Sequence, residues 1–231
     1  MLKSKHNFIV IGLGGSIIVP GKIQIDFLKK FRKLILTLIK QGHRFVIVTG
    51  GGNIARNYVQ SAVKICKVST QDKDWLGIQA TRINAYLLKA MFTNKCCPIV
   101  LDCPDKRVNL KKYSIYIGSG WKPGFSTDYD TILLAKKFRA EKIIFATDVS
   151  HVYEKDIRKY PQAKPMKRIT WKDYRKLISS KWRPGMKVPV DPVAAKLAQK
   201  LKYKVIITKG NNLGNLKNII ENKKFKGTII E

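Results

Sequence analysis

Short apolar runs alternate with amphipathic segments along this chain. The runs are rich in Ile, Val and Phe and mostly continuous, which is typical of strands buried on both faces of a sheet. They predict strands at Phe8–Ile11, Phe45–Val48, Ile99–Leu101, Ile115–Ile117, Ile143–Ala146, Val205–Thr208 and Thr228–Ile230. Helical periodicity predicts helices over 24–40, 74–92 and 191–202. The alternation predicts one α/β domain over residues 1–231, a three-layer α/β/α sandwich with a mostly parallel central sheet.

The predicted helix 74–92 carries two candidate faces. The apolar face, which we expect to meet the core, holds Leu76, Ala80, Ile83, Leu87 and Met91. The other face holds Asp74, Gly77, Thr81 and Asn84. A carboxylate near a helix start, followed by a glycine gap, is suited to accept hydrogen bonds from ribose hydroxyls. The plain structural alternative is that Asp74 caps the helix or complements its dipole.

Two glycine clusters follow predicted strands. The first is Gly12-Leu-Gly-Gly-Ser16, and the second is Gly50-Gly-Gly-Asn-Ile-Ala-Arg56, which leads into a helical pattern. Glycines let the backbone approach a ligand closely, and a helix start offers unpaired N–H groups, so each cluster predicts an anion cradle. Arg56 can add a charged fork. Because ligands of open parallel sheets bind beyond the carboxyl ends of the strands, both clusters, Asp128 and Asp148 are expected to converge there.

Several familiar chemistries lack their motifs. A dinucleotide fingerprint would need glycine at position 17, where this chain has Ile17, and neither a P-loop nor a protein-kinase signature occurs. The four cysteines contain no C-x-x-C pair and the three histidines are scattered, so we expect reduced thiols and no metal site formed by the protein. No apolar run is long enough for a membrane span. Lys3 and Lys5 precede an apolar stretch, but Gly14 interrupts it, so we expect a buried strand of a cytoplasmic protein and not a signal peptide.

The charge is strongly positive, with 46 basic against 15 acidic residues and a formal net charge of +31. A nucleic-acid partner is one interpretation. The basic residues form no compact arginine–aromatic block and no known nucleic-acid motif, so a lysine-rich surface arising from compositional bias is favoured. Such a field would still attract polyanionic substrates.

Two further segments carry candidate helix caps. In Pro123-Gly-Phe-Ser-Thr-Asp-Tyr-Asp130, either Ser126 or Thr127 is a candidate N-cap, and exposed donors there could meet a bound phosphate. Asp191-Pro192 has the pattern of an N-cap followed by proline at the first helical position. After the predicted strand at 143–146, Tyr153 and Asp156 could offer an aromatic wall and a carboxylate to an adenine.

Taken in order, these segments resemble the amino acid kinase superfamily, and within it the archaeal-type uridylate (UMP) kinases. The resemblance covers essentially the whole chain, and its most discriminating part is the segment Asp74–Ala85. The other similar segments are Gly14–Pro20, Gly50–Arg56, Pro123–Asp128, Asp191–Lys196 and Gly227–Ile230.

The resemblance implies transfer of the γ-phosphoryl of MgATP to UMP by a homohexamer with the amino acid kinase fold. It implies that UMP is held by Gly51, Asp74 and the segment Trp121, Lys122, Pro123, Gly124, Phe125, Ser126 and Thr127. Gly15, Ser16, Gly52 and Arg56 would lie at the ATP phosphates, and Thr147, Asp148, Tyr153 and Asp156 would line the adenosine site. Asp128 is taken as a catalytic residue within the UMP segment.

This chain also departs from the superfamily pattern. Gly12 stands where many members carry a first-strand lysine, so another cation must serve; we take Lys187 as this catalytic residue, with Lys122 as the alternative. His151 replaces a usual glycine before Tyr153. Two rival functions stay open: a superfamily kinase acting on isopentenyl phosphate, carbamate or an amino acid, and a non-catalytic member that binds nucleotide or RNA.

Overall fold

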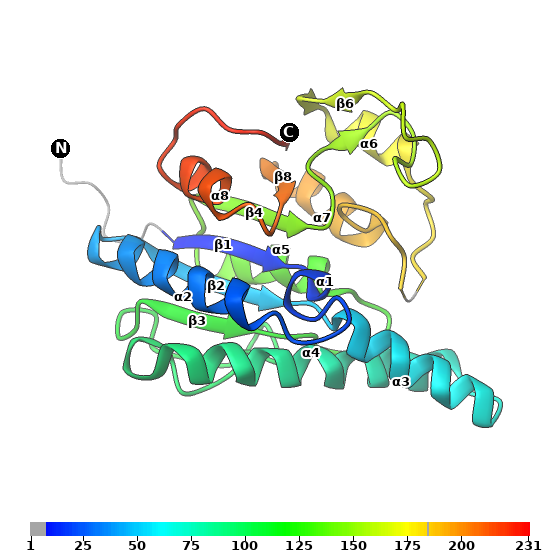
Figure 1. Ribbon diagram of the computed structural model, residues 1–231, viewed down its shortest axis with the longest axis horizontal. Coiled ribbons are helices and arrows are strands. Elements are labelled where there is room, and N and C mark those ends of the chain that lie inside the picture. Colours follow the sequence, from blue (N-terminus) through cyan, green and yellow to red (C-terminus); the bar gives the residue numbers. More distant parts are fainter. Residues whose placement is uncertain (1–7, 184) are drawn as a thin grey trace.

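A seven-stranded sheet in the order β3-β2-β1-β4-β8-β9-β7 forms the centre of the protein (Figure 1). The computed structural model describes residues 8–183 and 185–231. The strands are β1 (Phe8–Leu13), β2 (Arg44–Thr49), β3 (Ile115–Gly118), β4 (Lys142–Thr147), β7 (Arg168–Ile169), β8 (Val205–Lys209) and β9 (Thr228–Ile230). Strands β3, β2, β1, β4 and β8 run parallel, and only the β8–β9 pairing in this sheet is antiparallel. A separate hairpin pairs β5 (Val152–Tyr153) with β6 (Pro165–Met166).

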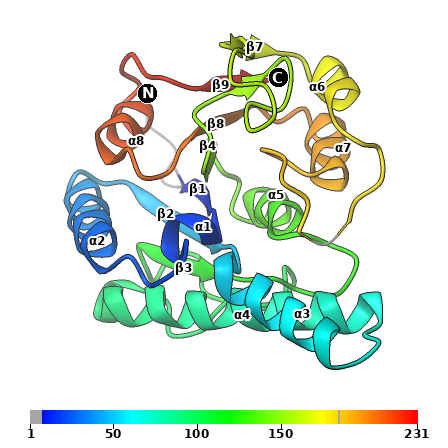
Figure 2. The same ribbon diagram turned by 45° about the vertical axis from the view of Figure 1, so that its right-hand side comes forward.

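Helices cover both faces of this sheet. They are α1 (Gly15–Ile18), α2 (Ile25–Lys40), α3 (Gly52–Ile65), α4 (Thr70–Phe92), α5 (Thr127–Lys137), α6 (Trp171–Leu177), α7 (Pro192–Lys200) and α8 (Leu213–Ile220). A 3₁₀ turn (Thr93–Lys95) follows α4. Helices α2 and α8 lie on one side of the sheet, whereas α5, α6 and α7 lie on the other (Figure 2). Among the described residues, no helix is long and apolar enough to cross a membrane.

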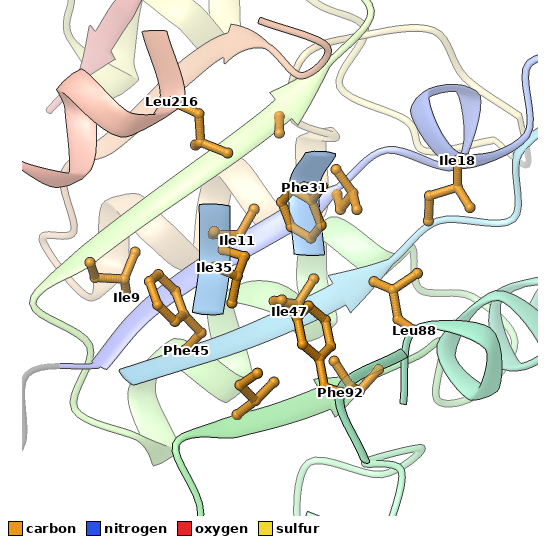
Figure 3. Close-up of a cluster of buried hydrophobic side chains, with 14 of the residues drawn as sticks. Ile9, Ile11, Ile18, Phe31, Ile35, Phe45, Ile47, Leu88, Phe92 and Leu216 are labelled. Atoms are coloured by element: carbon orange, nitrogen blue, oxygen red, sulfur yellow. The ribbon is translucent and has the colours of Figure 1, made fainter. Parts of the chain in front are cut away.

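The period-two pattern of β1 explains how one strand serves two cores. Ile9 and Ile11 point into the cluster formed with α2, α4 and α8, which also contains Phe31 and Phe45 (Figure 3). Phe8 and Val10 point into the opposite cluster with α5, α6 and α7. Successive strand residues face opposite sides of a sheet, so a continuously apolar strand must be buried on both. The predicted three-layer α/β/α sandwich is confirmed.

Two predictions about individual elements are wrong. Residues Ile99–Leu101 form no strand; Leu101 makes one isolated parallel bridge to Gly118. On the apolar stripe assigned to the core face of α4, the placement of Ile83 is wrong, because this residue is 61% exposed; Ala80 is buried, and Leu87 and Met91 pack partly buried against the core. The buried positions of this helix are Asp74, Ile78, Ala80, Thr81, Asn84, Ala85, Leu88 and Phe92. Three residues of the polar stripe are thus buried in the protein, whereas the apolar stripe is buried only in part.

The strand order places a topological switch point between β1 and β4. Strand β2 lies on one side of β1 and β4 on the other, so the connections after the two strands leave in opposite directions. In open α/β sheets, ligands bind beyond the carboxyl ends of the strands at such a point. Leu13 and Thr147 are the last residues of these two strands. The loop 185–191 precedes α7 near the same edge, where the Lys187 carbonyl and Asp148 both bind Arg158.

Candidate active site

The two glycine clusters pack backbone against backbone. A Cβ added to Gly15 would lie 2.0 Å from the amide nitrogen of Gly52 and 2.6 Å from the carbonyl carbon of Gly50. A Cβ on Gly52, whose φ is +64°, would lie 2.3 Å from the carbonyl oxygen of Gly15. Only glycine permits this approach. The turn after β1 and the turn after β2 therefore meet at the carboxyl edge of the sheet (Figure 1).

Hydrogen bonds hold both turns in place. The Gly50 amide donates to the carbonyl of Leu13 at 3.0 Å, and the Gly14 amide donates to the carbonyl of Ala146 at 2.9 Å. From α4, the buried Asn84 side chain donates its Nδ2 to the carbonyls of Gly50 at 2.8 Å and Gly51 at 3.3 Å. The first turns after β1 and β2 are thereby fixed to each other, to β4 and to α4.

Helix α3 begins directly from this junction. Its N-cap is Gly51, which has no capping side chain. The positive end of the helix dipole is therefore not occupied by a side-chain oxygen of the cap residue, which suits it to an anion. One turn further on, half-buried Arg56 is held by a 3.2 Å bond from its Nε to Oδ1 of Asn53. The geometry is that of an anion cradle with a charged side chain beside it.

Residues 119–126 form a loop that is tied down along its length; we call it the 119–126 loop. Its amides donate to Oγ1 of Thr81 (from Gly120, 2.8 Å), to Oδ2 of Asp130 (from Trp121, 3.1 Å) and to Oδ2 of Asp74 (from Gly124, 2.8 Å). At its end, the Ser126 hydroxyl donates to Oδ2 of Asp191. Helix α4, which carries Thr81 and Asp74, therefore joins this loop to the glycine turns.

Asp74 does not cap its helix. Helix α4 begins at Thr70, and Ser69 is its N-cap, so the carboxylate of Asp74 is in the second turn and free to face the 119–126 loop. Burial raises the pKa of Asp74, and the bond from the Gly124 amide partly opposes this shift. Asp74 is therefore neither the helix cap nor a first-turn acid. Its carboxylate instead links α4 to the 119–126 loop.

An aromatic stack borders the 119–126 loop. The ring of Phe125 stacks on Trp121 at 6.0 Å and on Tyr129 at 4.4 Å between centroids. The ammonium of Lys122 lies 4.1 Å from the Trp121 ring centroid. A lysine over a tryptophan face is attracted by the ring quadrupole. This contact gives Lys122 a position over the stack.

The starts of α5 and α7 meet over two buried carboxyl groups. Ser126 is the N-cap of α5 and Asp191 that of α7, as two of the predicted capping patterns indicated. The amide of Asp191 donates to Oδ2 of Asp128 at 3.0 Å. Burial, and next the neighbouring Asp191, raise the pKa of Asp128 well above its ordinary range; burial also raises the pKa of Asp191.

Asp130 is the third buried carboxyl group of this corner. One of its oxygens accepts the Trp121 amide, whereas its Oδ1 is buried without a hydrogen-bond partner among the described residues. Burial raises the pKa of Asp130 to about 7, a shift that the Trp121 amide opposes and the charge of Asp191 assists. Over the described residues, no group of His, Cys, Asp and Glu is arranged to hold a metal ion.

The residues predicted for the adenosine side gather after β4. Asp148 and Asp156 both bind Arg158, a residue that no motif in the sequence singles out. The hydroxyl of Tyr153 lies 2.9 Å from Oγ of Ser150, which also lies 3.0 Å from Nδ1 of His151. His151 therefore belongs to a small polar cluster beside Tyr153.

The space beyond Gly12 explains the absence of a first-strand lysine. A Cβ at this position would lie 2.9 Å from Cδ1 of Phe145 and 3.2 Å from Oγ1 of Thr131. The Phe145 ring of β4 occupies the volume into which a side chain at position 12 would extend. A cation in this corner must come from another element.

The structure brings many of the predicted site residues into direct contact with one another. Gly15 contacts Gly50 and Gly52, and Asp74 contacts Gly124. Trp121 and Lys122 both lie against the ring of Phe125. Ser126 and Asp128 both hydrogen-bond to Asp191. Lys187 is exposed in the loop before α7. Its carbonyl accepts a hydrogen bond from Arg158, which also binds Asp148 and Asp156.

Two glycine turns that meet at the switch point of an open α/β sheet are an arrangement suited to phosphate-bearing ligands. The chain belongs to the amino acid kinase family, whose model matches residues 7–209.

Within this family, individual uridylate kinases are similar to the chain over nearly its full length. The uridylate kinases of Thermococcus onnurineus and Thermococcus kodakarensis are each 36% identical to it over 227 residues, which cover 96% of this chain and 99% of each relative. The crystal structure of uridylate kinase from Archaeoglobus fulgidus is similar, with a TM-score of 0.78 and 28% identity over 96% of this chain and 99% of that one.

Proposed function

We propose that this chain is a UMP kinase that transfers the γ-phosphoryl of ATP to UMP, giving UDP and ADP. The observation that carries the proposal is the backbone contact between the two glycine turns, which would bring two bound phosphate groups together at one edge of the sheet. The family match and the near full-length similarity to uridylate kinases support the same function. Of the rival functions, a non-catalytic binder would also use such cradles, so activity must decide.

Our assignment of residues follows from their places around the glycine turns. We assign UMP to the side formed by Gly51, Asp74 and the segment 121–127, where α4 and the 119–126 loop face each other. We assign the ATP phosphates to Gly15, Ser16, Gly52 and Arg56, and the adenosine to Thr147, Asp148, Tyr153 and Asp156. Bound in this way, the two nucleotides would meet with their phosphates at the junction of the turns.

The chemistry needs no covalent nucleophile, because the acceptor is itself a phosphate. The protein has to bring two polyanions together in line and stabilise the charge of the transferred group. Backbone amides of the glycine turns, the start of α3 and Arg56 would do this electrostatically. Magnesium would enter with ATP as part of the substrate. Asp128 and Lys187 are proposed as catalytic residues, Lys187 as the cation that the first strand lacks.

A homo-oligomer is part of the proposal. Helices α3 and α4 lie side by side at one end of the molecule (Figures 1 and 2) and expose large apolar side chains. These are Tyr58, Val63, Ile65, Trp75, Ile83 and Tyr86. Of these residues, Trp75 also lines a cavity of about 400 Å³, together with Cys66 and Leu76. An apolar surface of this kind marks an interaction site. A second copy of the chain is the proposed occupant, within the homohexamer that the resemblance implies.

One assay separates the proposed function from its rivals. Purified protein is mixed with MgATP and, in turn, UMP, CMP, isopentenyl phosphate, carbamate and an amino acid, and ADP is measured. We expect ADP with UMP, and none when EDTA removes magnesium. ADP only with isopentenyl phosphate, carbamate or an amino acid would assign another superfamily activity, and no ADP with any acceptor would favour the binding role. Light scattering of the same sample tests the oligomer, which a monomer at all concentrations would refute.

A further inference from the structure

One arginine contacts three residues of the candidate site, which lie on the turn after β4, in the connection between β5 and β6, and in the loop before α7. Arg158 lies in the connection between β5 and β6. Its Nη2 donates to both oxygens of Asp148, at 3.2 Å and 3.0 Å, and its Nη1 donates to Oδ1 of Asp156 at 3.4 Å. The same Nη1 donates to the carbonyl of Lys187 at 3.1 Å. The resemblance implies Asp148 and Asp156 for the adenosine site, and Lys187 is the proposed cation of the reaction.

These contacts connect to the glycine turns through β4. Asp148 follows the last residue of β4, and Ala146 in that strand accepts the Gly14 amide at 2.9 Å. The carbonyl of Thr147, the next residue, accepts the Gly210 amide at 2.8 Å. The position of Arg158 is therefore tied by short steps to the first glycine turn and, through the Lys187 carbonyl, to the loop before α7.

The geometry makes this more than an ordinary surface ion pair. Single exposed pairs contribute little to stability, but here Nη2 contacts one carboxylate while Nη1 contacts a second carboxylate and a carbonyl, so the plane of the guanidinium is fixed as well as its charge. The Arg158 side chain is 32% exposed and that of Asp148 is 49% exposed, so water screens the pair only in part. A lysine could supply the charge but not the planar fork that serves two carboxylates and a carbonyl at once.

We propose that Arg158 is a positioning residue for ATP, which sets the loop carrying Lys187 against the end of β4. This inference rests on the proposed function of the site. Arg158 also neutralises Asp148 and Asp156, two carboxylates that would otherwise repel the phosphates of an incoming ATP. Loss of the side chain should therefore weaken ATP and leave UMP, held on the α4 side, nearly unaffected.

The test compares Arg158→Gln and Arg158→Lys with the matched control Arg168→Gln. Arg168 also pairs with a carboxylate, Glu231, at 2.7 Å, but on strand β7 and in a more exposed position. We expect Arg158→Gln to raise the KM for ATP by about tenfold, equivalent to about 1.4 kcal/mol, with the KM for UMP changed by less than about twofold. Arg158→Lys should give an intermediate increase, because charge returns without the fork. Arg168→Gln should change neither constant.

Two further measurements make the result decisive. Calorimetric titration with magnesium and a non-hydrolysable ATP analogue should show the same loss of affinity in Arg158→Gln, at an unchanged melting temperature. The double variant Arg158→Gln/Lys187→Ala should lose less affinity for the ATP analogue than the sum of the two single losses, because both residues act on one loop.

The outcomes distinguish this inference from the proposed function. If the wild-type protein binds the analogue but does not phosphorylate UMP, a weakened Arg158→Gln complex supports the positioning role and the UMP kinase assignment fails. If the wild-type protein phosphorylates UMP while Arg158→Gln keeps the wild-type KM and affinity for ATP, the positioning role is overturned. Equal losses for ATP and UMP, or no analogue binding by the wild-type protein, would overturn it as well.

Discussion

Replacing Gly15 by alanine tests the contact on which the site is built. The added Cβ would lie 2.0 Å from the Gly52 amide nitrogen and 2.6 Å from the Gly50 carbonyl carbon, whereas ordinary contacts begin near 3.4 Å. These neighbours are backbone atoms held by strands and helices, so no side chain can rotate away. The two turns would have to separate by more than an ångström.

The expected cost has a structural and a catalytic part. Forcing atoms into a packed region costs about 1–3 kcal/mol of unfolding free energy, and backbone neighbours favour the upper end. A displacement of about 1 Å between reacting groups can lower a rate by about 100-fold. Gly21→Ala is the matched control, since its Cβ would have no neighbour within 4 Å.

Urea denaturation gives the free energy of unfolding, and UDP formation gives kcat. We expect Gly15→Ala to lose both stability and nearly all activity, and Gly21→Ala to stay within about 0.5 kcal/mol of wild type with normal kcat. Wild-type stability and kcat in Gly15→Ala would refute the reasoning, because the turns would then not need their close approach.

Three more substitutions have defined outcomes. Burial raises the folded-state pKa of Asp130 to about 7, so between about pH 4 and 7 the folded state binds a proton that the unfolded state has lost. The free energy of unfolding should therefore fall as pH rises through this range, by up to about 1.4 kcal/mol per pH unit. Asp130→Asn should make this slope shallower, because Asp128 and Asp191, whose pKa values are also raised, still contribute to it; identical pH dependence in denaturation curves would contradict the assignment. Asp74→Asn should raise the KM for UMP more than that for ATP, and equal changes would argue against its assignment. Arg56→Ala should cost about 1.5–3 kcal/mol in kcat/KM for ATP, and unchanged kinetics would exclude it from the cradle.

The layers of the fold were predictable because burial on both faces leaves a direct mark on a strand. Phe8–Leu13 is apolar at nearly every position, and the structure uses alternate residues of it for two separate cores. The run Ile99–Leu101 carries the same mark over a shorter length. It forms only a bridge to Gly118, because a short apolar run can be buried beside a strand without pairing along it.

The orientation of α4 could not be derived from periodicity. Its apolar residues lie on two faces, one packed inside with Leu88 and one exposed with Ile83. Nothing in the pattern distinguishes a stripe that meets the sheet from one left on the surface. The buried polar residues Asp74, Thr81 and Asn84 decide the matter in the structure, because each makes hydrogen bonds to the glycine turns or the 119–126 loop.

The glycine junction was predictable in outline, and the partners around it were not. Glycines after two neighbouring parallel strands must approach one edge of the sheet, which is how Gly15 and Gly52 meet. Arg158 gave no comparable signal, since one basic residue among 46 is inconspicuous. Asp130 likewise has the sequence position of an ordinary first-turn acid. Only the structure shows that it is buried and accepts the Trp121 amide.

Following the phosphoryl group itself tests the central claim most directly. The protein is incubated with UMP and ATP labelled in the γ-phosphate, and the products are separated. If the two glycine turns hold the nucleotides with their phosphates together, the label appears in the β-phosphate of UDP, in step with ADP. Label that stays in ATP, or appears only in inorganic phosphate while UMP remains unchanged, would contradict the account.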